Sequence, residues 1–108
     1  MRLELFRTLW GYRGTWQQAI DELLSAGFDG LEARVPETAA QRVTNARLLR
    51  EQRVPYIATL FTSTPVLPRQ SDGVEAHLQD LAHKLDWAAE LSPRKVNILA
   101  GNDRWPMA

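Results

Sequence analysis

Two oppositely charged residues, Glu32 and Arg34, stand two positions apart in the stretch FDGLEARVPE, residues 28–37. Apolar residues alternate with them, and this period of two predicts a β-strand over residues 31–35 with both charges on one face. The Glu32 carboxylate could accept a hydrogen bond from a substrate hydroxyl or act as a general base. It could equally form a structural ion pair, because residues two apart on a strand lie about 6 to 7 Å from one another.

Further candidates lie where predicted strands end. Trp10 follows the first predicted strand, where it could form an apolar wall for a ligand ring or cap the core. Asn97 lies on the fourth predicted strand and shares a face of that strand with Leu99 and Gly101. Asn102 and Asp103 follow that strand and could bind substrate or a metal, although Asn-Asp is also a frequent turn sequence.

The common catalytic and metal-binding motifs do not occur in the sequence. Cysteine is absent, which excludes a thiol nucleophile, Cys-ligated zinc and disulfides. His77 and His83 fall within one predicted helix, and a spacing of six does not place them on a common face for a shared metal. No P-loop, GxGxxG, HExxH or GxSxG pattern occurs. We therefore predict no metal ligands among these residues.

Strands and helices are predicted to alternate along the chain. Helix signals include Thr15 as an N-cap and Gly27 as a terminator. Strands are expected at 3–9, 31–35, 56–62 and 95–101, and helices at 16–26, 38–52 and 73–91.

Each predicted helix carries an apolar stripe that should face the sheet. The stripes comprise Trp16, Ile20, Leu23 and Leu24; Ala39, Val43, Ala46 and Leu49; and Val74, Leu78, Leu81, Leu85 and Ala88. His77 is expected at the edge of the third stripe and His83 opposite it.

A β-α-β-α-β-α-β order implies right-handed crossovers and a parallel sheet. An open doubly wound sheet and part of a (β/α)8 barrel both satisfy this order. In the doubly wound sheet, Glu32 and Arg34 would lie beneath a layer of apolar helices, which is costly for charges. In the barrel they would face the lumen, so we predict an α/β fold of parallel (β/α) units, a partial TIM barrel.

Length and charge bound the remaining possibilities. The 108 residues predict a single domain spanning 1–108, and 13 basic residues balance 13 acidic ones. This balance gives no strong field for nucleic acid or anionic lipid, so neither partner is expected. The charged first 14 residues do not read as a signal peptide, and no apolar run is long enough for a membrane helix. A cytoplasmic protein is expected.

Three stretches resemble one known family. LFRTLWG in the first strand, AGFDGLEA leading into the second, and VNILAGND around the fourth are similar to the sugar phosphate isomerase/epimerase group of the xylose-isomerase-like TIM barrels. The resemblance extends over nearly the whole chain. It implies proton transfer next to a carbonyl of a sugar or sugar phosphate, in carbohydrate metabolism, assisted by a divalent metal ion.

The resemblance covers only the N-terminal half of such a fold, because a complete barrel takes about 250 residues. Relatives bind their metal mostly through residues of later strands, so metal ligands are expected outside this chain. Many relatives also carry His-Ser/Thr-Gly where this chain has Leu99-Ala100-Gly101. The resemblance therefore implies substrate-binding roles here for Trp10, Arg34, Asn97 and Asp103, with Glu32 as the catalytic candidate.

Two other functions remain open on the sequence. A non-catalytic half-barrel could form a homodimer, because its first and fourth strands would be open edges. A metal-dependent endonuclease acting on abasic sites is also found in the same superfamily, although the neutral charge balance disfavours it.

Overall fold

The computed structural model describes residues 3–61 and 74–99. It contains β1 (Phe6–Thr8), α1 (Trp16–Ser25), β2 (Gly30–Arg34), α2 (Ala39–Gln52), β3 (Tyr56–Phe61), α3 (Val74–Ala89) and β4 (Lys95–Leu99). The predicted alternation of strands and helices is confirmed. None of the described helices is both long and apolar enough to cross a lipid bilayer.

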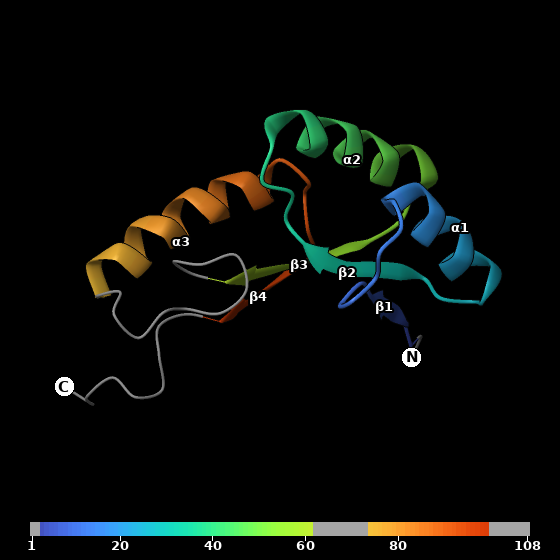
Figure 1. The fold of residues 1–108 in the computed structure, drawn as a ribbon. Helices are drawn as coiled ribbons and strands as arrows, with labels where there is room; N and C mark the ends of the chain where they lie inside the picture. The colour runs from blue at the N-terminus through green and yellow to red at the C-terminus, as the bar shows by residue number, and fades with distance from the viewer. Residues whose placement is uncertain (1–2, 62–73, 100–108) are drawn as a thin grey trace.

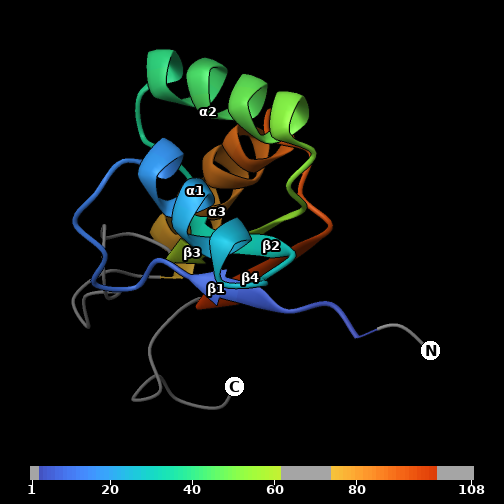
Figure 2. The ribbon, with the colours of Figure 1, turned by 90° about the vertical axis from the view of Figure 1, so that its right-hand side faces the viewer.

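The four strands form one parallel sheet in the order β1-β2-β3-β4. All three helices lie on the same side of this sheet, above it in Figure 1, and the side view in Figure 2 shows the same single layer. This consecutive order with a single helix layer is that of a half-barrel, meaning four successive strand units of a (β/α)8 barrel. The doubly wound alternative is wrong, because it requires helices on both faces.

The first strand is shorter than the sequence predicts. Its ladder with β2 runs only from Phe6 to Thr8. Just before it, the Leu5 amide donates to the Asp29 carboxylate at 2.9 Å, and the Leu5 carbonyl accepts from the amides of Asp29 and Gly30. The chain at Leu5 is therefore bound to the start of β2 and to the turn that precedes it, one residue before the β1 ladder begins.

The core lies between the helix layer and the facing side of the sheet. Alternate residues of the two central strands contribute to it, and α1 adds Ile20 and Leu23. The strand residues that face the helices are Leu31, Ala33, Val35, Tyr56, Ala58 and Leu60. Their neighbours on the strands therefore point to the opposite, helix-free face.

Local capping signals set the helix ends. Thr15 accepts a hydrogen bond from the Gln18 amide, and the Gln18 side chain accepts one from the Thr15 amide, which completes a capping box. Thr38 caps α2 through the Gln41 amide. Gly27 takes φ +87° directly after α1, a conformation that glycine adopts without strain. The predicted Thr15 and Gly27 signals are confirmed.

The predicted core stripe of α3 is confirmed for Leu81 and Ala88 and wrong for its other three residues. Val74, Leu78 and Leu85 are exposed, whereas His77 is buried at 3% exposure together with Ala88. The cause is Lys84, whose ammonium donates to the Phe61 carbonyl at the end of β3. This contact turns the side of α3 that carries Lys84 toward the sheet and leaves the most apolar stripe on the helix flank.

Tyr56 links two central strands through a buried polar contact. Its hydroxyl donates to the Ala33 carbonyl at 2.7 Å, and its ring packs 5.3 Å from that of Trp16. Burial raises the pKa of the Tyr56 phenol, because the charged form would be desolvated. The neutral hydroxyl is therefore favoured by folding.

Replacing Tyr56 with Phe should lower the free energy of unfolding by about 1 kcal/mol at neutral pH, through loss of this hydrogen bond. The native pKa lies above the ordinary value of 10.0, so the unfolded chain ionises first and wild type loses stability as pH rises past 10. The difference between wild type and Tyr56→Phe should therefore shrink above pH 10 in urea titrations. A difference that stays constant with pH would contradict this role of burial.

Candidate functional site

The helix-free face of the sheet carries a set of polar side chains. The register pairs Thr8 with Glu32, Arg34 with Thr59, and Thr59 with Asn97. Paired residues of neighbouring strands point to the same side, so these five residues share the helix-free face. Arg34 and Thr8 are exposed, whereas the other three are half-buried. The face that sequence reasoning assigned to the lumen therefore carries these polar side chains beside the apolar Ile57 and Phe61, and no helix of the described residues covers it.

The sheet curls toward this face. The Asn97 side-chain amide donates to the Glu32 carboxylate at 3.3 Å, reaching from β4 over β3 to β2. At the amino-terminal end of the sheet, the Arg94 guanidinium pairs with the Glu4 carboxylate, so that the chain just before β4 meets the chain just before β1. Neighbouring strands are about 4.8 Å apart, so contacts that skip one and two strands are favoured when the helix-free face is concave.

A cavity of about 540 Å³ opens at the carboxyl ends of β1, β2 and β3. Side chains from the helix-free face and from the loop after β1 surround it. Its lining includes Thr8, Trp10, Tyr12, Trp16, Glu32 and Arg34. Barrel active sites are built at this end of the strands, and the volume falls within the range of small-molecule sites.

Two aromatic rings and one guanidinium stand together beside this cavity. Trp10 is 66% exposed, and its ring lies 5.9 Å from that of Phe61. Arg34 stands over the Phe61 ring at 5.9 Å and pairs with the exposed Glu37 carboxylate at 3.5 Å. An exposed pair of this length is weak, so the guanidinium remains accessible to an anionic ligand.

The loop after β1 is fixed by Arg7 and Tyr12. Arg7 forms an ion pair with Glu22 of α1 at 3.1 Å, and its guanidinium stands 5.3 Å from the Tyr12 ring. Desolvation and the Glu22 carboxylate raise the pKa of the Tyr12 phenol, and Arg7 opposes that shift. Tyr12 is therefore a neutral hydrogen-bonding group on the cavity wall at physiological pH.

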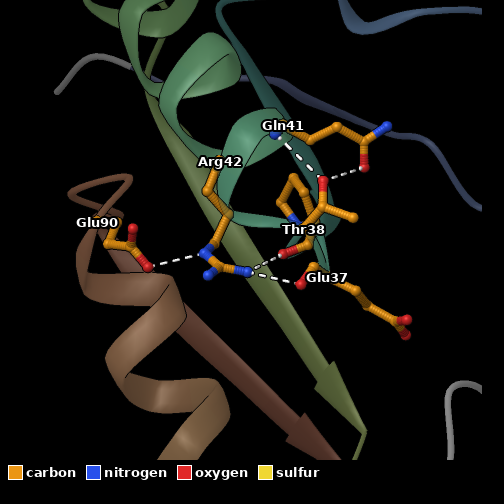
Figure 3. Close-up of polar contacts among 6 residues, drawn as sticks. Glu37, Thr38, Gln41, Arg42 and Glu90 are labelled. Atoms are coloured by element: carbon orange, nitrogen blue, oxygen red, sulfur yellow. Dashed lines mark hydrogen bonds and ion pairs between the residues drawn. The ribbon is translucent and has the colours of Figure 1, made fainter.

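A buried arginine holds the loop that follows β2 (Figure 3). Arg42 of α2 is 6% exposed, and its Nε donates to the Glu90 carboxylate at 2.7 Å. Its Nη1 donates to the carbonyls of Glu37 and Pro36 at 2.8 and 3.1 Å, and its guanidinium stacks 4.6 Å from the Trp87 ring. We call Arg42, Glu90 and Trp87 the arginine clasp.

The arginine clasp explains a second error in the predicted stripes. Val43 was expected to face the core, but it is exposed, and the neighbouring Arg42 points inward instead. The Arg42 guanidinium donates to two backbone carbonyls and to the Glu90 carboxylate, so its hydrogen-bonding groups are satisfied in the buried position. The clasp thereby anchors the backbone of Glu37, the residue that pairs with Arg34 beside the cavity.

Four of the predicted site residues come together on the concave face. Glu32 and Asn97 are in contact. The Trp10 ring and the Arg34 guanidinium each lie 5.9 Å from the Phe61 ring on the same face. Asp103 and Asn102 lie outside the described residues. Sequence analysis did not single out Phe61. Alternation along the predicted strand 56–62 would have placed it on the face opposite Leu60.

Metal ligands are not assembled in the part of the chain that the structure describes. Within residues 3–61 and 74–99, no three His, Asp or Glu side chains converge closely enough to hold a metal ion. Glu32 is the carboxylate on the concave face beside the cavity, and its described side-chain neighbour there is the Asn97 amide. The divalent metal implied by the resemblance therefore does not fit the described residues.

Comparisons with known proteins found no match to this chain among family models, curated proteins or solved structures. The resemblance to sugar phosphate isomerases and epimerases thus stays a prediction. The features that bear on function are those of the concave face itself.

Replacing Arg42 with Ala should lower the free energy of unfolding by about 2 to 3 kcal/mol, because two carbonyls and Glu90 lose their donors. Arg47 lies on the same helix and is exposed, so Arg47→Ala should change stability by less than about 0.5 kcal/mol. Chemical denaturation of both variants provides the comparison. Equal losses for the two would show that the clasp contributes nothing specific.

Proposed function

We propose that the concave face binds a sugar or sugar phosphate and that Glu32 moves a proton at the carbon next to the substrate carbonyl. This is the isomerase or epimerase chemistry that the resemblance implies. The observation that carries the proposal is the placement of Glu32, Trp10 and Arg34 around one cavity, on the helix-free side and at the carboxyl ends of the strands.

The cavity offers the contacts that a carbohydrate requires. The exposed Trp10 ring supplies an apolar surface for the C–H face of a sugar ring. Thr8, Glu32 and the Tyr12 hydroxyl supply hydrogen-bonding groups around it. Arg34 supplies a guanidinium that can hold a phosphate or carboxylate through two hydrogen bonds. A polyhydroxylated ligand with one anionic group uses all of these.

Glu32 is placed to act as the base. Its carboxylate is half-buried and accepts a hydrogen bond from Asn97, which orients one carboxylate oxygen and leaves the other available. The base would remove a proton from the hydroxyl-bearing carbon beside the carbonyl, giving an enediolate with the negative charge on the former carbonyl oxygen. Returning that proton from Glu32 to the neighbouring carbon, while a proton passes between the two oxygens through water, isomerises the sugar. Epimerisation instead takes a proton from water on the opposite face and leaves the first proton on Glu32.

The first test is deuterium exchange. Fructose 6-phosphate incubated with the protein in D₂O should gain deuterium at the carbon next to its carbonyl, as followed by proton NMR. Exchange requires only removal of the proton, so it measures proton abstraction by Glu32 even where conversion of the sugar is slow. Glu32→Gln keeps the shape and the Asn97 contact, and it should reduce the exchange rate at least about 100-fold, the usual range for loss of a general base.

Binding is measured separately by calorimetry with fructose 6-phosphate and fructose. Trp10→Ala should weaken both ligands about tenfold through loss of the apolar wall. Arg34→Gln should weaken the phosphate ester alone, and Arg47→Ala should change neither affinity. Binding without exchange in wild type would reduce the proposal to a carbohydrate-binding face. Absence of both binding and exchange would refute it.

A further inference from the structure

Exposed apolar residues gather at the two edges of the half-barrel. At the β1 edge, Leu3 and Leu5 are 78% and 48% exposed. At the β4 edge, Ile98 is 44% exposed, and α3 presents Val74, Leu78 and Leu85. The opposite flank of α3 carries Trp87, which packs on Arg42 of α2, so the apolar flank faces away from α2 and toward β4.

Backbone groups on the outer side of each edge strand have no hydrogen-bond partner in a further strand of the described residues. Within the described ranges, β1 pairs with β2 alone and β4 with β3 alone. Exposed parallel edges flanked by apolar side chains favour addition of a further strand. The curl of the sheet toward its helix-free face directs such an addition into a closed barrel.

We propose that the occupant of both edges is a second copy of this chain, which closes an eight-stranded barrel with two-fold symmetry. A two-fold axis along the barrel keeps every strand parallel. It brings β4 of each copy beside β1 of the other, so one arrangement covers both edges at once. The proposal does not depend on the proposed sugar chemistry.

The strand register places opposite charges at each seam, meaning the junction between β4 of one copy and β1 of the other. A path along paired residues from Thr8 passes through Glu32 and Ile57 to Lys95. In barrels of this type the strands tilt right-handedly, and the path descends by about eight residues per circuit, hence about four over each half. The path that starts at Thr8 therefore meets β1 of the second copy four residues earlier in the sequence. Glu4 of the second copy thus lies opposite Lys95. Lys95 is exposed and makes no ion pair within residues 3–61 and 74–99.

The same offset of about four residues brings exposed apolar residues of the two copies together. The neighbouring path joins Ala33, Ala58 and Val96 and extends at β1 to Leu9, so that Leu5 of the second copy lies opposite Val96. That side chain would lie next to Ile98, under the apolar flank of α3. Residues that are exposed in one copy thus cover one another across the seam, with the acidic residue of one edge opposite the basic residue of the other.

The test exchanges the two charges. Sedimentation velocity should show a dimer for the wild-type chain, and Glu4→Lys or Lys95→Glu alone should weaken it at least about tenfold, since each places like charges at both seams. Mixing the two variants should restore the dimer, because each seam then joins opposite charges. Native mass spectrometry with one variant ¹⁵N-labelled identifies that heterodimer.

Controls separate the seam from folding. Circular dichroism checks that each variant keeps the wild-type fold. Glu4→Lys also loses the ion pair with Arg94 in the same chain. Because this loss occurs both when the variant is alone and when it is mixed with Lys95→Glu, it does not affect the comparison between the two. Arg47→Glu on α2 should leave the dimer unchanged. A wild-type monomer at every attainable concentration would overturn the proposal, and so would a mixture that forms no heterodimer.

Discussion

Packing of all three helices against one face of the sheet is the constraint on which the rest of the structure depends. It buries the apolar residues of β2 and β3 and leaves every second residue of those strands without a covering helix. Glu32 and Arg34 can occupy strand interiors because their face remains open to water, so the desolvation of buried charges does not arise. The polar concave face is therefore a direct consequence of the single helix layer.

Much of this fold follows from local sequence signals. Period-two alternation predicted β2, a run of β-branched and aromatic residues predicted β3, and Thr15 and Gly27 marked the limits of α1. The helix faces were harder to predict, because tertiary contacts decided them. Lys84 reaches the Phe61 carbonyl and rotates α3, and Arg42 points inward to bind carbonyls that no sequence window identifies. Both errors concern long side chains whose partners are distant in sequence.

The residues of the candidate site were also predicted in part. Strand parity placed Glu32 and Arg34 on one face, the family resemblance assigned Asn97 to the lumen, and Trp10 was predicted at the end of the first strand. The contact between Glu32 and Asn97 could not be predicted, because it depends on curvature that brings β2 and β4 within reach of one another across β3. The arginine clasp was also missed, although it fixes the loop bearing Glu37. The face on which a strand side chain lies could thus be predicted from the sequence, whereas distances between side chains across the sheet could not.

Thiol reactivity at two adjacent positions of β3 tests the helix-free face most directly, because the natural chain has no cysteine to interfere. In the Lys95→Glu background, which weakens the proposed dimer, the half-buried Thr59→Cys should react with a water-soluble disulfide reagent within about tenfold of the rate of an unstructured thiol. Ala58→Cys, which points at the helices, should react at least about 100-fold more slowly, limited by opening of the core. Equal protection of both thiols would mean that the second face is also covered, and the account of the site would fail.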